Sequence, residues 1–197
     1  MIDFQEDQSS GYASRTIKNA AADVTIAIAY DFNSAGEKLT KKAVLEQGKL
    51  YFPVELERFG LKNYQGGVLN IVQHLALRIK ELNTSEITLN IAGNGLYTLK
   101  NTSIRNQEVC DYFTYHFLKH LVNELDRQRT NGNFETKIIS IRTGGQTGFD
   151  EAGAKAADKL GIPTLVLAPK GWCFRDESGE DIYNEEAFKK RFKTINE

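Results

Sequence analysis

A glycine-rich loop, Gly144-Gly145-Gln146-Thr147-Gly148, lies between an apolar run and a helical pattern. A helix N-terminus offers unpaired N–H groups and a partial positive charge, and glycine lets an anion approach the backbone closely. We therefore predict that these five residues form a phosphate-sized anion cradle from backbone N–H groups and the Thr147 hydroxyl. A tight turn without a ligand is the alternative that this loop alone leaves open.

Two further loops of small residues, Asp31–Gly36 and Gly93–Gly95, also follow apolar, β-branched runs. Ligands of open parallel sheets bind beyond the carboxyl ends of the strands, so three such loops are expected to converge on one site. Gly93–Gly95 taken alone favours a simple turn. The candidate ligand contacts from these two loops are Gly36, Gly93 and Asn94. The glycine loop matches neither Walker A nor G-x-G-x-x-G, so a kinase-type ATPase and a standard NAD enzyme are not supported.

Charged side chains near these loops supply the other candidates. Arg15 and Lys170 are counter-charges for a phosphate, with a solvated surface position as the alternative for each. Asp150 heads the helix after the glycine loop, where it either caps that helix or accepts a hydrogen bond from a ligand hydroxyl. His116 and His120 have metal-ligand spacing but no third ligand, so we expect ordinary core or surface histidines and no metal site. The basic residues of 189–193 are expected to form a solvated helix face rather than a nucleic-acid patch.

Strands and helices that would position these residues alternate along the chain, which predicts βαβ units and a parallel sheet. The expected strands are 23–30, 50–56, 87–92, 137–141 and 164–168. The expected helices are 37–47, 63–82, 107–128, 150–160 and 184–192. The predicted fold class is α/β, a Rossmann-like, open, mainly parallel sheet with helices on both faces.

Size and composition restrict the function classes. The 197 residues suit one domain, 1–197, and the formal net charge of −1 gives no basic field for general nucleic-acid binding. Two distant cysteines, Cys110 and Cys173, and an acidic N-terminus indicate a reduced cytoplasmic setting without a signal peptide. No apolar run approaches the roughly 20 residues of a membrane span.

The segment GGQTGFDEAGAKAADKLGIP, followed by PKGW, resembles the molybdenum-cofactor-carrier family of the SLOG class, which also contains the DprA and LOG proteins. Segments within 12–25, 36–43 and 89–93 resemble other parts of the family pattern, but here they precede the glycine loop instead of following it. We infer a circularly permuted version, in which Tyr12 lies near the segment after Gly171. The resemblance implies binding of a nucleotide or a related phosphorylated ligand, and it adds Thr40 as a second anion contact.

Glu151 follows the loop at a spacing similar to that of a glutamate in the LOG phosphoribohydrolases, which implies N-glycosidic hydrolysis as an alternative. The function expected is binding or carriage of a phosphorylated small molecule, namely a nucleotide or a cofactor such as the molybdenum cofactor. The alternatives are a nucleotide-processing enzyme with Glu151 or Asp150 as the acid/base group, and a module that senses or sequesters a nucleotide signal. Domains of this class often self-associate, so a homo-oligomer is expected.

Overall fold

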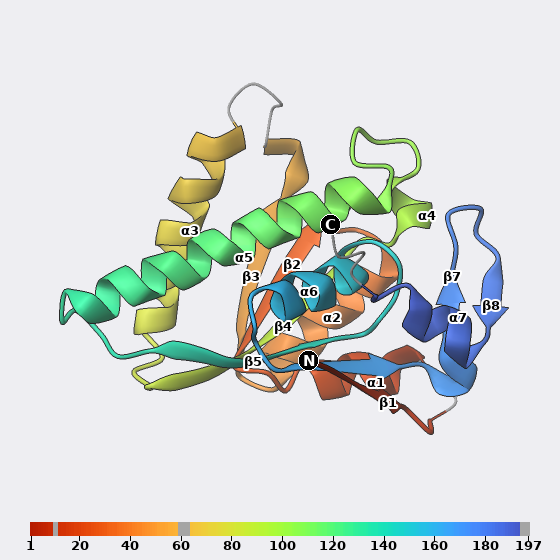
Figure 1. Cartoon of the computed structure of the whole chain (residues 1–197), viewed down its shortest axis with the longest axis horizontal. Helices are drawn as coiled ribbons and strands as arrows, with labels where there is room; N and C mark the ends of the chain where they lie inside the picture. Colours follow the sequence, from red (N-terminus) through yellow and green to blue (C-terminus); the bar gives the residue numbers. More distant parts are fainter. Residues whose placement is uncertain (10–11, 59–63, 194–197) are drawn as a thin grey trace.

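Six parallel strands form the central sheet of the computed structural model, which describes residues 1–9, 12–58 and 64–193 (Figure 1). The spatial order is β3-β2-β4-β5-β6-β1. The strands are β1 (Ile2–Glu6), β2 (Val24–Ala29), β3 (Leu50–Glu55), β4 (Glu86–Gly93), β5 (Lys137–Thr143) and β6 (Thr164–Ala168). Every residue of β2 is buried, as expected for a central strand covered on both faces.

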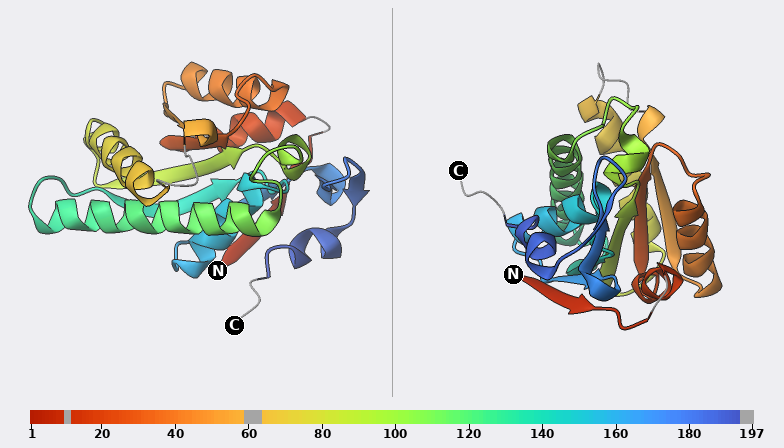
Figure 2. Two further views of the ribbon diagram at one scale, coloured as in Figure 1. Left: turned by 90° about the horizontal axis from the view of Figure 1, so that it is seen from above. Right: turned by 90° about the vertical axis from the view of Figure 1, so that its right-hand side faces the viewer.

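Helices cover both faces of the sheet, which confirms the predicted α/β class (Figure 2). On one face lie α1 (Tyr12–Asn19) and α2 (Ala35–Glu46), and on the other α3 (Tyr64–Lys80), α5 (Gln107–Thr130) and α6 (Phe149–Lys159). The largest hydrophobic cluster joins the sheet to α3, α5 and α6. A much smaller cluster of Ala20, Ala43 and Val44 lies under α1 and α2. The α1–α2 face therefore has little apolar packing, and it is the face that borders the cavity described below.

A small subdomain closes the β1–β6 edge. It consists of η2 (Lys170–Trp172), the antiparallel pair β7 (Cys173–Arg175) and β8 (Asp181–Tyr183), and α7 (Glu185–Lys190). Its apolar side chains include Phe174, Phe188 and Phe192, which pack with the β1–β6 end of the sheet. Gly171 N donates to Glu6 Oε1 at 2.5 Å, so the end of β1 lies beside η2. The permuted arrangement predicts that Tyr12 lies near the segment after Gly171, but the Tyr12 side chain lies outside the described residues.

The five predicted strands and five predicted helices are all present, with ends shifted by at most two residues. The sequence-based prediction omitted β1, α1, the short α4 (Leu96–Leu99), η1 (Leu56–Arg58) and the β7–η2–β8 region. Only alternate residues of β1 are partly buried, since it is an edge strand.

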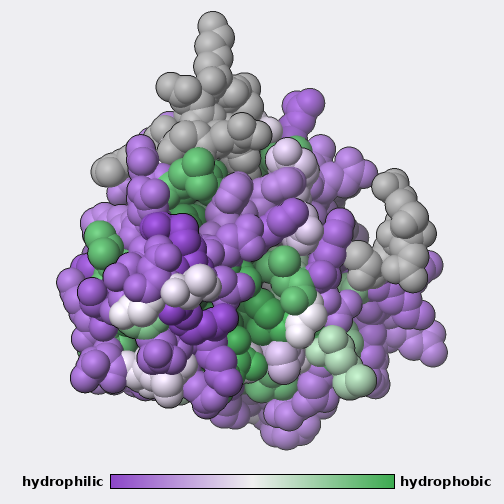
Figure 3. All heavy atoms as spheres, turned by 60° about the vertical axis from the view of Figure 1, so that its left-hand side comes forward, coloured by the Kyte–Doolittle hydropathy of each residue, from purple (hydrophilic) through white to green (hydrophobic). Residues whose placement is uncertain are grey.

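No helix in the described part of the chain is both long and apolar enough to span a membrane. In the view of Figure 3, hydrophilic residues cover most of the surface, and apolar residues gather in a smaller area near its middle.

The connections reverse direction between β2 and β4. The chain passes outward from β2 to β3, then returns across the sheet to place β4 on the other side of β2. Ligands of open α/β sheets bind at such a switch point, outside the carboxyl ends of the strands. The loop after β2 and the loop after β4 both open here.

Candidate functional site

A cavity of about 490 Å³ lies at this switch point, bordered by α1, the start of α2 and the ends of β4 and β5. Its size is within the usual range for small-molecule sites. The three predicted loops all contribute to its walls, as do most of the predicted ligand contacts. The predicted residues that line it are Arg15, Gly36, Thr40, Gly93, Asn94, Gly144, Gln146, Thr147 and Asp150. Gly145, Gly148, Lys170 and Glu151 are not among the lining residues.

The glycine loop is largely occupied by hydrogen bonds within the protein. Gly145 N donates to Thr143 Oγ1 at 3.1 Å, and Gly148 N donates to Gln107 Oε1 at 2.7 Å. The Thr147 hydroxyl donates to the Arg175 carbonyl at 2.8 Å. These donors were predicted to hold an anion, and the structure corrects that prediction, because protein acceptors already take them.

Two loop glycines are required for packing. Gly145 has φ +70°, and a Cβ there would lie 2.6 Å from Phe188 Cζ and 2.7 Å from Val166 Cγ1. Gly148 has φ +84°, and its Cβ would meet the backbone of Asn94 and Gly95. Both residues therefore face the protein interior, which is why neither lines the cavity.

Gln146 and Thr147 attach the β7–β8 pair to the loop. Gln146 Nε2 donates to the Cys173 carbonyl at 3.1 Å, and Gln146 Oε1 accepts from Arg175 N at 3.2 Å. With the Thr147–Arg175 bond, three hydrogen bonds hold β7 beside the cavity. Cys173, Arg175 and Asp181 thereby become part of the wall.

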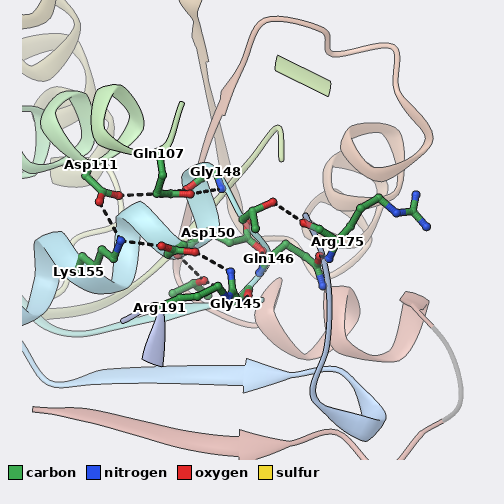
Figure 4. A network of polar contacts seen from close by, with 12 residues as sticks. Gln107, Asp111, Gly145, Gln146, Gly148, Asp150, Lys155, Arg175 and Arg191 are labelled. Atoms are coloured by element: carbon green, nitrogen blue, oxygen red, sulfur yellow. Dashed lines mark hydrogen bonds and ion pairs between the residues drawn. The ribbon is translucent and has the colours of Figure 1, made fainter. Parts of the chain in front are cut away.

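Glu151 does not line the cavity, and it belongs to the polar network of Lys155 and Arg191 that Figure 4 shows. Its carboxylate pairs with Lys155 Nζ and with Arg191 Nη1, each at 2.6 Å, and its side chain is 4 % exposed. Lys155 also reaches Asp111, and Arg191 also donates to the Gly145 carbonyl at 2.8 Å. Neighbouring residues of a helix point about 100° apart, so Asp150 faces the cavity and Glu151 faces this network. The predicted catalytic role of Glu151 has no support from its position.

Arg191 also departs from the prediction of a solvated basic face. Its guanidinium lies 4.1 Å from the Phe174 ring centroid and 4.8 Å from that of Phe188. Its side chain is 15 % exposed, whereas Lys190 and Lys193 are exposed as predicted. Arg191 thus fastens α7 to the underside of the glycine loop.

The start of α2 borders the cavity. Ser34 caps the helix, since its Oγ accepts from Glu37 N at 3.3 Å and its carbonyl accepts from Lys38 N at 3.1 Å. The hydrogen bonds of the described residues include no acceptor for the N–H groups of Ala35 and Gly36, and both residues line the cavity. The helix has 12 residues, enough for a developed dipole. This terminus suits an anion by its dipole and its two N–H groups; in the glycine loop the N–H groups of Gly144 and Thr147 also have no acceptor among the described residues.

Asn94 holds the cavity walls together. Its Oδ1 accepts from Tyr30 N at 2.9 Å and from Asp31 N at 3.0 Å, and its Nδ2 donates to the Asp31 carbonyl and to Glu37 Oε1. It lines the cavity as predicted, but its side chain is committed to the loop after β2. Thr40 likewise donates its hydroxyl to the Gly36 carbonyl at 3.0 Å.

Two buried carboxyl groups, Glu37 and Asp150, face the same cavity. Burial, with the charges of Asp150 and Asp31, raises the pKa of Glu37 to about 8. Burial also raises the pKa of Asp150 to about 6, against the opposing effect of the Arg15 guanidinium. A Cβ on Gly144 would lie 2.6 Å from Asp150 Oδ2 and 3.3 Å from Arg15 Nε, so both charged groups press on the loop backbone there. At neutral pH, therefore, Glu37 holds a proton while Asp150 is mostly ionised.

Three side-chain oxygens in residues of the cavity wall have no hydrogen-bond partner among the described residues: Asn19 Oδ1, Asn90 Oδ1 and Glu37 Oε2. Asn90 Nδ2 donates to Thr25 Oγ1 at 3.2 Å, which turns the amide oxygen away from that strand. Buried polar groups are nearly always paired, so each unpaired oxygen is a specific feature of this site.

The remaining predicted groups lie elsewhere. Lys170 is exposed on η2, next to Pro169, which does line the cavity. His116 packs beside Tyr112 with ring centroids 4.3 Å apart. Within the described ranges, no group of three or more His, Cys, Asp and Glu side chains is arranged to hold a metal ion. Cys110 is a buried thiol, and Cys173 is a half-buried one.

Sequence reasoning missed Glu37, Asn19 and Asn90. Ser34-x-x-Glu37 is the pattern of a capping box, which explains the glutamate locally. In the structure Ser34 does cap the helix, but the Glu37 carboxyl turns to Asn94 and the cavity. Asn90 had a usable indicator, because a lone amide inside an otherwise apolar strand needs a buried partner or a ligand.

Comparison of the chain with protein-family models, with curated proteins and with solved structures found no match.

Proposed function

We propose that this protein binds a phosphorylated small molecule of the nucleotide class in the cavity between the ends of β2 and β4. The observation that carries the proposal is the start of α2, where two N–H groups without a protein acceptor adjoin a cavity of about 490 Å³. A helix N-terminus of this kind stabilises phosphate oxygens by hydrogen bonds and by its dipole. The resemblance to the molybdenum-cofactor-carrier family supports the same ligand class and adds that cofactor to the compounds to be tested.

The phosphate would contact Ala35 and Gly36 rather than the glycine loop. Arg15 is 3 % exposed, lines the same cavity and supplies the positive charge next to Asp150. The glycine loop contributes indirectly, since it positions Asp150 and holds β7 in the wall. Binding or carriage needs no further chemical group.

A matched pair of variants tests this proposal. Ala35 is exposed at the first position of α2, so Ala35→Glu and Ala35→Gln should both fold, and the acidic variant suits the helix dipole. A carboxylate within several ångströms of a bound phosphate costs about 1 kcal/mol or more. We expect Ala35→Glu to weaken phosphate-ligand binding about tenfold and Ala35→Gln to weaken it less than threefold.

The assay begins with mass spectrometry of compounds released from the native protein by denaturation. Thermal-shift measurements follow, with inorganic phosphate, pyrophosphate and the ribonucleoside mono-, di- and triphosphates. A ligand that raises the Tm of wild type and Ala35→Gln clearly more than that of Ala35→Glu supports the proposal. No co-purified phosphorylated compound and no Tm shift across the panel would overturn it.

Acid–base catalysis on the bound nucleotide is a second candidate, favoured by the Glu37–Asp150 pair. One carboxyl group that holds its proton near neutral pH and a neighbour that has mostly lost it provide a general acid and a general base in one cavity. N-glycosidic hydrolysis fits this pair, because Glu37 would protonate the leaving base and Asp150 would take a proton from the attacking water.

Asp150→Asn separates the two candidates. If the protein is a carrier, wild type and Asp150→Asn should both keep the ligand and neither should turn it over. If it is an enzyme, Asp150→Asn should still bind the nucleotide but should no longer release the free base, which chromatography measures. Absence of base release from every wild-type nucleotide complex would rule out this hydrolysis.

A further inference from the structure

Three residues that line the cavity beside α2 each carry a buried side-chain oxygen without a partner among the described residues. Asn19 Oδ1, Asn90 Oδ1 and Glu37 Oε2 make no hydrogen bond among the described residues, and the three residues are 4 %, 2 % and 5 % exposed. They come from α1, β4 and α2, three separate elements that meet at this cavity. Buried amide oxygens can only accept. A bound group that satisfies them must therefore donate hydrogen bonds.

The charge balance favours an uncharged donor. Arg15 and Asp150 are opposite charges in the same wall, and burial keeps Glu37 protonated at neutral pH. An ammonium ligand would lose its hydration and gain no net negative charge in return. Hydroxyl groups fit better, since each can donate to an asparagine oxygen and accept from a protonated carboxyl group.

A nucleobase is a poorer occupant of this end. Bases need a flat apolar or aromatic surface for stacking. Among the described lining residues the aromatic side chain is Tyr97, which belongs to α4. The Lys100 ammonium lies 4.1 Å from its ring centroid, and a Cβ on Gly179 would be 2.6 Å from its Cε2. Lys100 and Gly179 thus contact this ring, which is 43 % exposed and is the one aromatic surface among the described lining residues.

We propose that Asn19, Asn90 and Glu37 recognise vicinal hydroxyl groups of a sugar phosphate, so that this cavity accepts a ribose-containing phosphate and discriminates against the deoxyribose form. The inference rests on the proposed function, since a phosphate at Ala35 and Gly36 places the attached sugar beside Glu37, one residue further along α2. Asn19 and Asn90, which line the same cavity, would then accept hydrogen bonds from the two hydroxyl groups.

Titration calorimetry of the full chain tests the inference with D-ribose 5-phosphate, 2-deoxy-D-ribose 5-phosphate and inorganic phosphate. We expect wild type to bind the ribose compound at least tenfold more tightly than the deoxy compound, because one hydroxyl and its hydrogen bonds are lost. Asn90→Leu and Glu37→Met replace the oxygens by apolar groups, and each should reduce this preference below threefold. Affinity for inorganic phosphate should stay within about twofold, and Glu46→Met, exposed on the same helix, is the control.

The outcomes distinguish the two proposals. Equal affinity of wild type for both sugar phosphates would overturn the hydroxyl recognition and leave phosphate binding at α2 intact. A full preference retained in both folded variants would overturn the assignment to these residues. Failure of all three compounds to bind, together with failure of the nucleotide panel, would overturn both proposals. Far-UV circular dichroism checks folding, and Glu37→Met provides the test should Asn90→Leu fail to fold.

Discussion

Replacing Glu37 by glutamine should remove a pH-dependent loss of stability between pH 5 and pH 8. Burial, with the charges of Asp150 and Asp31, raises the pKa of Glu37 from its ordinary 4.5 to about 8. The folded chain therefore holds this proton more tightly than the unfolded chain does. The resulting stabilisation is fully present below pH 4.5 and is lost progressively as the pH rises through about 8.

The size of the effect follows from the two pKa values. At about 1.4 kcal/mol for each pKa unit, the whole change from 4.5 to about 8 corresponds to an upper limit of roughly 5 kcal/mol. Glutamine has the shape of the protonated acid, keeps an acceptor for Asn94 and does not titrate. We expect the variant to equal wild type near pH 5 and to exceed it by roughly 2–4 kcal/mol at pH 8. For a chain of this size, that difference raises Tm by roughly 5–15 °C.

Urea denaturation followed by circular dichroism at pH 5, 6, 7 and 8 measures this difference. Glu46→Gln is the matched control, because Glu46 lies on the same helix with 65 % of its side chain exposed and a 3.7 Å pair with Lys42. Its free energy of unfolding should follow wild type at every pH, since exposed ion pairs contribute little. Parallel pH profiles for wild type and Glu37→Gln would refute the conclusion that Glu37 is protonated in the folded chain at neutral pH.

Three further substitutions test the interpretation of the glycine loop. Gly145→Ala should lower the free energy of unfolding by roughly 2–4 kcal/mol, because overpacking and the positive φ act together. Gly161→Ala, with φ +71° and open space around it, should lower it by only about 1 kcal/mol. Equal losses of the two variants in denaturant titrations would contradict the packing role of Gly145. Glu151→Gln should lower that free energy by roughly 1–3 kcal/mol and leave the calorimetric affinity for D-ribose 5-phosphate unchanged, so a selective loss of affinity would return Glu151 to the site. Gln146→Ala should accelerate hydrogen exchange of the Arg175 amide by about tenfold, because that N–H loses its acceptor; an unchanged rate would show that β7 is held by other contacts.

The central strands could be predicted because their local sequence is sufficient. Val24–Ala29 is apolar throughout and buried on both faces, so no knowledge of its neighbours is needed. The edge strand Ile2–Glu6 is different, since its alternating and partly exposed residues become a strand only beside β6, at Thr164–Ala168. Helix α1 was missed for a related reason, because its buried residues include Arg15 and Asn19, which face a cavity rather than an apolar core.

The sequence predicts where the cavity lies, but not which of the nearby N–H groups already have protein acceptors. Three loops rich in small residues at the carboxyl ends of strands do converge on one cavity. Which N–H groups remain for a ligand depends on residues distant in sequence, such as Gln107, which takes Gly148 N, and Thr143, which takes Gly145 N. A glycine loop and an ordinary cap such as Ser34 look unequal in the sequence, yet among the described residues both the start of that helix, at Ala35 and Gly36, and the loop, at Gly144 and Thr147, keep N–H groups without a protein acceptor in the cavity wall. An unpaired N–H donor predicts an anion site, but acceptors of the protein itself can take the same donor. Packing between residues distant in sequence decides which of the two happens.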